Sequence, residues 1–356
     1  MSLRDYLRAI DPSRKGARNL TFEEAREAFS AILSGTESDI SSASFLVAMR
    51  YKGVTVEELR GFATAARNRA HIPCQDVSGL VCICSPHDGT AGVPPLDVAS
   101  GLIAAGAGAR VLILSDKAVP PRRGLTAANV LDQLGAQMTW DPDEAESWVA
   151  KTRFAACSVS GMLPALMQLR KVRDEVGVRT PLSTIEKLIA PASAAVVIGA
   201  QGGPVLGIAV EVMQGLGHPH AITLQGIEGG VTPYISRRTR GVELDRSHLV
   251  TLHVEPKDFG LDDTREPELP LFCPPPDGQG PGDTPGLVKA AGDLNALALA
   301  GEPGRERKAA VLGAALILKA AGRSMTLAEG VDAATRSLDS GEASAVLTRY
   351  KELSNS

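Results

Sequence analysis

Two loops rich in glycine and basic residues carry the side chains of this chain that are best suited to bind an anion. Each loop follows a short apolar run typical of a β-strand, residues 80–84 and 109–114. Backbone N–H groups of a glycine-rich turn and basic side chains both suit phosphate. The carboxyl ends of neighbouring parallel strands meet at one edge of a sheet. We therefore predict a phosphate-handling α/β region over residues 85–135, with anion-binding residues Asp88, Gly89, Thr90, Gly92, Lys117, Arg122 and Arg123.

A third basic group, Arg237, Arg238 and Arg240, follows a Glu-Gly-Gly turn that begins at Glu228. Arginine side chains from separate loops of one cleft would add to an anion site, so Arg237 and Arg238 are also predicted to bind an anion. The alternative is a solvated surface on which nearby acidic residues neutralise these arginines. His87 adjoins Asp88 and could exchange protons near neutral pH, although a loop histidine without a catalytic role is the alternative.

Composition limits the class of partner. The 356 residues carry a formal net charge of −4, so the chain as a whole does not attract nucleic acid or a membrane surface, and any basic site must be local. The first ten residues include charged side chains, and no run approaches the roughly 18 apolar residues of a membrane span. These features predict a cytoplasmic protein that does not associate with a membrane.

The five cysteines are odd in number and scattered. Cys82 and Cys84 alternate on a predicted strand and so face the same side, which allows a metal or redox role but favours buried, reduced thiols. The sequence contains no Ser-His-Asp order, Walker loop, zinc spacing or dinucleotide fingerprint. We therefore predict no metal site, and the catalytic residues stay unassigned.

The periodicity of apolar residues predicts two lobes. Residues 1–73 show helical spacing, with N-caps at Thr21, Ser38 or Ser41, and Thr55. Apolar strand-like runs alternate with helical segments over 74–162 and 191–356, which predicts a mostly parallel sheet flanked by helices. Helices within about 163–190 are expected to rejoin the helical lobe. A Pro/Gly-rich loop is predicted at 262–286, followed by helices at 287–300, 304–322 and 326–350.

Short segments in a fixed order resemble the anthranilate phosphoribosyltransferase family, part of the nucleoside phosphorylase and phosphoribosyltransferase class. They are KGVTVEE at 52–58, VLDQLG at 130–135, KVRDEVGVRT at 171–180, and GDLNA at 292–296 with LDSG at 338–341. The resemblance covers almost the whole chain. It implies a helical lobe hinged to an α/β lobe, with phosphoribosyl diphosphate and its Mg²⁺ bound in the cleft. By position, Arg173 matches the family's acceptor-binding arginine; the alternative is a helix-surface arginine paired with Asp174 or Glu175. His87 and Glu228 are also predicted to bind substrate.

The chain departs from the family at the motifs that carry its chemistry. The family's Gly-Thr-Gly-Gly-Asp loop corresponds to residues 85–92, its Lys-His-Gly-Asn turn to 113–116, and its metal-binding Asp-Glu pair to Val231 and Thr232. A Glu-Gly turn followed by an Arg-Arg pair resembles a divergent branch of the family whose members bind nucleic acid. Mg²⁺ is therefore expected only if phosphoribosyl diphosphate is bound.

Three hypotheses follow. The first is a pentosyltransferase-fold protein that binds a phosphorylated ribosyl ligand at a basic cleft between the lobes and lacks the standard anthranilate activity. The second is a non-catalytic protein that binds single-stranded nucleic acid in the same cleft, and the third is a scaffold or regulator. A homodimer through the helical lobe is also expected, because Phe29, Phe45, Leu46 and Phe62 exceed what a small lobe can bury alone.

Overall fold

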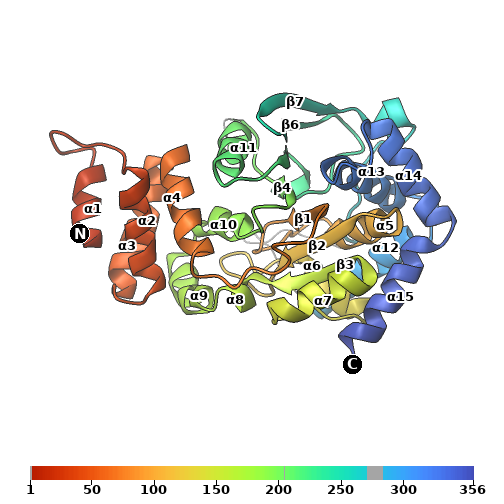
Figure 1. Cartoon of the computed structure of the whole chain (residues 1–356), viewed down its shortest axis with the longest axis horizontal. Coiled ribbons are helices and arrows are strands. Elements are labelled where there is room, and N and C mark those ends of the chain that lie inside the picture. Colours follow the sequence, from red (N-terminus) through yellow and green to blue (C-terminus); the bar gives the residue numbers. More distant parts are fainter. Residues whose placement is uncertain (1, 204, 271–283) are drawn as a thin grey trace.

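A seven-stranded sheet forms the centre of the larger lobe (Figure 1). The computed structural model describes residues 2–203, 205–270 and 284–356. The strand order is β3-β2-β1-β4-β5-β6-β7, and the first five strands in that order are parallel to one another. The strands are β1 (Leu80–Cys84), β2 (Arg110–Ser115), β3 (Phe154–Ser158), β4 (Ala195–Gly199), β5 (His220–Leu224), β6 (Thr239–Asp245) and β7 (His248–Val254).

The N-terminal helices form a separate lobe at one end of the molecule (Figure 1). They are α1 (Leu3–Ile10), α2 (Phe22–Leu33), α3 (Asp39–Lys52) and α4 (Val56–Arg67). Thr21, Ser38 and Thr55 each accept a hydrogen bond from the third residue of the helix that they cap. The predicted starts of α2 and α4 are confirmed, and of the two alternatives for α3 the structure has Ser38 rather than Ser41. Later in the chain, α9 (Ala165–Val176) packs on α3, and α10 (Leu182–Ile185) packs on α4.

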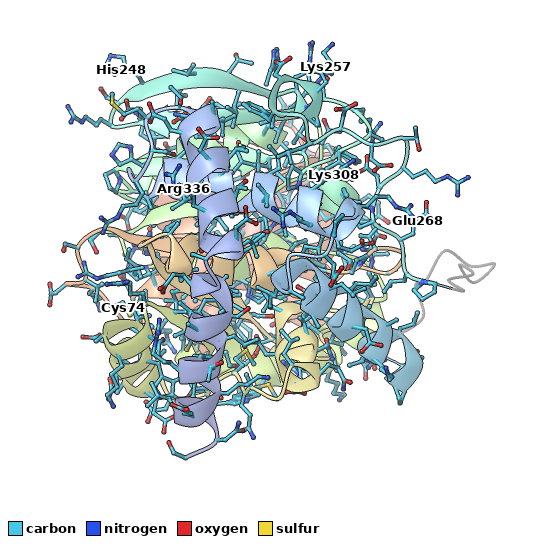
Figure 2. All side chains as sticks on the ribbon, turned by 90° about the vertical axis from the view of Figure 1, so that its right-hand side faces the viewer. Cys74, His248, Lys257, Glu268, Lys308 and Arg336 are labelled. Carbon is cyan, nitrogen blue, oxygen red and sulfur yellow. The ribbon has the colours of Figure 1, made fainter. Side chains whose placement is uncertain are left out.

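Helices cover the sheet and complete the larger lobe. They are α5 (Asp97–Gly106), α6 (Ala127–Gln133), α7 (Pro142–Thr152), α8 (Val159–Met162), α11 (Val205–Gly215), α12 (Pro285–Leu299), α13 (Arg305–Ala320), α14 (Leu327–Asp339) and α15 (Glu342–Ser354). Figure 2 views the side away from the helical lobe, where Arg336 and Lys308 lie on α14 and α13. Helix α5 and residues 309–320 of α13 are mostly buried and supply small and aliphatic residues to the core. The predicted fold class is therefore confirmed.

Two elements differ from the prediction. The pattern of apolar residues does not predict strand β6. This strand pairs antiparallel with both β5 and β7, so the parallel sheet ends in an antiparallel edge. The helix predicted over 326–350 is divided into α14 and α15 at Gly341, whose φ of +80° lies in the left-handed region. Most of the predicted 262–286 loop lies outside the described residues.

The four cysteines that the structure describes are all buried. Cys74, Cys82, Cys84 and Cys157 are buried free thiols, and burial raises the pKa of each one. Cys273 lies outside the described residues. In the ranges that the structure covers, no helix is long and apolar enough to cross a bilayer.

Candidate functional site

The two loops predicted to bind an anion lie side by side at the carboxyl edge of the sheet. The Gly124 N–H donates to the Asp88 carbonyl at 2.9 Å, and Thr90 and Leu125 exchange backbone hydrogen bonds of 2.9 and 2.8 Å. Strand β1 stands between β2 and β4, where the strand order reverses. Open α/β sheets bind ligands at such a position. The fold therefore brings the loops together where a ligand site is expected.

The first loop already holds a carboxylate, that of Glu228. The Ala91 and Gly92 N–H groups donate to the two Glu228 oxygens at 2.8 and 2.7 Å. Arg122 Nη1 donates to one of the same oxygens at 3.0 Å and also to the Gly89 carbonyl at 3.1 Å. Two consecutive N–H groups and a guanidinium thus surround one carboxylate, which is the donor arrangement of an anion site.

Most of the other predicted anion-binding cations are paired with acidic residues of the chain. Lys117 bonds to Asp132, Arg123 to Asp174 at 2.8 Å, and Arg238 to Glu255 at 3.0 Å. Asp88 accepts two hydrogen bonds from Arg179, at 2.6 and 2.8 Å, and its side chain is buried. Pairing lowers the local positive charge, so the cleft is less basic than the sequence suggests.

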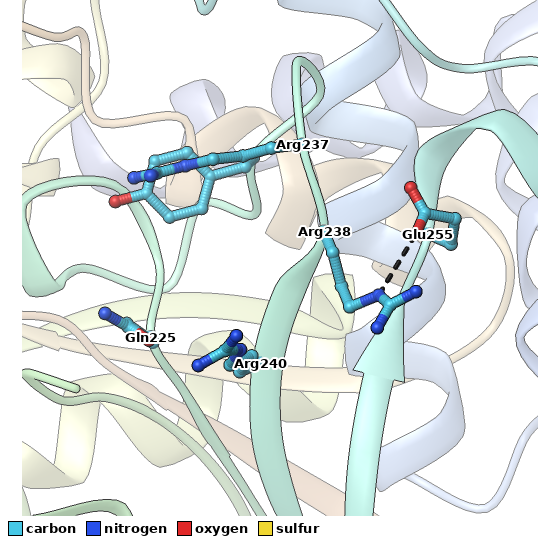
Figure 3. Close-up of a pocket in the computed structure, with 6 residues that line it drawn as sticks. Gln225, Arg237, Arg238, Arg240 and Glu255 are labelled. Atoms are coloured by element: carbon cyan, nitrogen blue, oxygen red, sulfur yellow. Dashed lines mark hydrogen bonds and ion pairs between the residues drawn. The ribbon is translucent and has the colours of Figure 1, made fainter. Parts of the chain in front are cut away.

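Arg237 is arranged differently from the other cations. Its guanidinium lies over the Tyr234 ring, 4.0 Å from the ring centroid. The two side chains border a cavity of about 440 Å³ that is also lined by Gln225, Arg238, Arg240 and Glu255 (Figure 3). Within the described part of the chain, neither Arg237 nor Arg240 forms an ion pair.

Arg173 and His87, two predicted substrate-binding residues, are buried. Arg173 bonds to Glu186, to the Pro120 carbonyl at 2.8 Å and to the Ser183 hydroxyl at 3.3 Å. The Arg173 guanidinium is therefore already bonded to other groups of the protein. Burial lowers the pKa of His87 to about 4, so the imidazole is neutral near pH 7. Neither ring nitrogen of His87 has a hydrogen-bond partner among the described residues.

A cavity of about 250 Å³ lies between the lobes, and apart from Asp88 its polar lining consists of residues that were not predicted as site residues from the sequence. We call it the interlobe cavity; its polar lining includes Arg50, Asp88, Arg179, Thr180, Ser183 and Lys187. Lys187 Nζ donates to the Gly199 carbonyl at 2.6 Å, and burial lowers its pKa to about 8. The signal available in the sequence was Lys187, which with Glu186 lies in the otherwise apolar stretch 185–190.

The Glu228 and Asp88 carboxylates are not free to hold Mg²⁺. Mg²⁺ requires carboxylate oxygens that are free to coordinate it, whereas the Glu228 and Asp88 carboxylates are bonded to N–H groups and guanidinium groups. Val231 and Thr232, at the positions of the family's metal-binding pair, offer no carboxylate. In the parts of the chain that the structure covers, no three His, Cys, Asp or Glu side chains are grouped to hold a metal ion.

Comparisons with known proteins agree with this architecture. Residues 8–70 match the model of the glycosyl transferase family helical bundle domain, and residues 89–344 match its a/b domain. The chain is 28% identical over 339 residues to anthranilate phosphoribosyltransferase of Symbiobacterium thermophilum, covering 95% of each protein. It is 29% identical to that of Methanosphaerula palustris, covering 93% of each.

Solved structures show the same fold. Anthranilate phosphoribosyltransferase from Thermus thermophilus aligns with a TM-score of 0.80 at 24% identity over 99% of each chain. The Saccharomyces cerevisiae enzyme in complex with PRPP and Mg aligns with a TM-score of 0.76 at 17% identity, over 99% of this chain and 98% of the other.

Proposed function

Because the chain belongs to the anthranilate phosphoribosyltransferase family of glycosyl transferases, we propose that it binds a phosphorylated ribosyl ligand in the interlobe cavity without efficient turnover of anthranilate. The observation that carries the proposal is the cavity lining. Lys187 supplies positive charge for phosphate, and the Thr180 hydroxyl is buried there with no partner among the described residues. A buried hydroxyl is normally hydrogen-bonded, so a ligand hydroxyl or phosphate oxygen supplies the missing partner.

The same contacts support weak turnover. Departure of diphosphate requires neutralisation of the developing negative charge. Glu228 instead places a negative charge on the first loop, and Arg122 is bonded to it. The proposed site is the interlobe cavity, which Asp88 also lines.

We expect phosphoribosyl diphosphate to bind the pure protein in calorimetry, whereas kcat/KM with anthranilate and Mg²⁺ falls at least about 100-fold below that of the Symbiobacterium enzyme. Thr180→Val removes one hydroxyl at nearly constant shape and should weaken ligand binding by about 2–10-fold. The matched control is Thr348→Val, at an exposed position on α15. Rapid formation of phosphoribosyl anthranilate, or ligand affinity unchanged in Thr180→Val, would overturn the proposal.

Binding of single-stranded nucleic acid is a second candidate, favoured by the guanidinium of Arg237 stacked on Tyr234 beside Arg240. Aromatic and arginine surfaces of this kind stack on bases and bind backbone phosphates. If this function holds, the wild type binds oligonucleotides of any sequence. Arg237→Ala with Arg240→Ala should then reduce the salt slope by about 0.7 for each phosphate that is no longer neutralised. Phosphoribosyl diphosphate binding without oligonucleotide binding at about 0.15 M salt would exclude this candidate.

We also propose a homodimer through the helical lobe, on different residues from those first expected. The expectation that the lobe cannot bury Phe29, Phe45, Leu46 and Phe62 alone is wrong, because all four are buried within a single chain. The Phe62 ring lies 5.6 Å from the Phe29 ring and 6.0 Å from the Phe45 ring. The exposed apolar side chains are Ile40 and Tyr51 of α3, 79% and 76% exposed. We expect a dimer by light scattering at micromolar concentration, and Ile40→Glu with Tyr51→Glu should give a monomer. A monomeric wild type would contradict the proposal.

A further inference from the structure

The Glu228 carboxylate occupies an anion site that the chain builds for itself. Its two oxygens accept from the Ala91 N–H, the Gly92 N–H and Arg122 Nη1, at 2.8, 2.7 and 3.0 Å. A phosphate oxygen pair has the same charge sign and suits the same donors. Since a carboxylate already uses these donors, an external anion has to compete with Glu228 for them.

The donors at this site are used by the Glu228 carboxylate. The Ala91 and Gly92 N–H groups each donate to one of its oxygens, and the Arg122 and Glu228 side chains form an ion pair in which they are only 26% and 25% exposed. An external anion therefore reaches these donors only when the Glu228 carboxylate moves away from them.

The backbone that carries Glu228 is held in a strained conformation. Glu228 has a φ of +52° in the left-handed region, which is uncommon for a residue with a Cβ. The turn also packs closely on the end of β4, because a Cβ at Gly199 would lie 2.4 Å from the Gly229 carbonyl oxygen. Such strain persists where surrounding contacts compensate for it, and here the contacts are the three hydrogen bonds to the carboxylate.

We propose that Glu228 is an internal ligand of the 88–92 loop: it blocks a latent phosphoryl-anion site, and removal of its carboxylate opens that site to inorganic pyrophosphate. This goes beyond the proposed function, because the anion site is formed by the loop and Arg122 rather than by the interlobe cavity. Phosphorylated ligands reach the loop only after Glu228 is displaced, and displacement also frees Arg122.

The test uses inorganic pyrophosphate and two variants. Glu228→Gly removes the carboxylate and tolerates the positive φ, so the turn keeps its conformation. We expect it to bind pyrophosphate at least about tenfold more tightly than the wild type, as expected when charge-assisted hydrogen bonds become available. Addition of pyrophosphate should shift the Ala91 and Gly92 amide NMR signals in the variant and leave those of the wild type unchanged. Glu228→Gln, which keeps the shape and one acceptor, should show a smaller gain.

Matched controls separate the loop site from a general gain of positive charge. Asp174→Asn frees the neighbouring Arg123 without exposing backbone donors, and it should not gain pyrophosphate binding. Glu228→Gly combined with Arg122→Met should lose the gain. Equal pyrophosphate affinity in wild type and both Glu228 variants, or a gain that survives Arg122→Met, would overturn the inference. Neither result affects the Thr180→Val test of the interlobe cavity, so the two proposals can fail separately.

Discussion

Arg173→Met is expected to lower the free energy of unfolding by about 3–5 kcal/mol, because it leaves the Glu186 carboxylate buried without its ion-pair partner. Both side chains are only 3% and 5% exposed, and one Glu186 oxygen already has no hydrogen-bond partner among the described residues. An uncompensated buried charge costs more than the ion pair itself contributes. Denaturant titration of the two proteins measures the difference.

Two further variants make this prediction specific. Lys171→Met changes an exposed residue on the same helix, whose ion pairs are 3.6 and 3.9 Å long, and it should cost less than about 0.5 kcal/mol. The double variant Arg173→Met with Glu186→Met removes both charges and should be more stable than Arg173→Met alone. If Arg173→Met unfolds like the wild type but loses ligand affinity, the arginine binds an acceptor rather than supporting the fold.

Gly89→Ala is expected to destabilise the protein by about 2–5 kcal/mol, from steric overlap together with left-handed backbone strain. Gly89 has a φ of +75°, and an added Cβ would lie 2.4 Å from the Gly124 carbonyl carbon and 2.5 Å from the Leu125 carbonyl oxygen. The substitution therefore pushes apart the two loops that form the site. We expect a lower unfolding midpoint in urea.

The control for Gly89→Ala is Gly79→Ala. Gly79 has a similar φ of +66°, but no atom lies within 4 Å of its added Cβ. Gly79→Ala therefore measures the loss of stability caused by left-handed backbone strain alone, which is expected to be about 1–2 kcal/mol. Equal losses of stability in the two variants would show that the close approach of the loops does not contribute.

Features set by neighbouring residues were predictable from the sequence. The N-caps at Thr21 and Thr55 depend on a glutamate three residues later, and the alternation of strands and helices dictates a parallel sheet. Because the loops that follow parallel strands lie at the same edge of a sheet, the proximity of the Asp88 and Arg122 loops could also be predicted from the sequence. Strand β6 was not predictable, because its residues form a strand by pairing with β5 and β7 rather than through a marked apolar pattern.

Charge pairing was decided by the tertiary structure alone. The Glu228 carboxylate reaches the N–H of Ala91, 137 residues earlier in the chain, and no local pattern records that pairing. Arg173 is likewise unavailable to a ligand, because folding buries it against Glu186. The sequence by itself determined which residues could bind an anion and on which loops they lie. Folding determined whether each charge faces a ligand or another part of the chain, because electrostatic pairing depends on distances that only the packed lobes set.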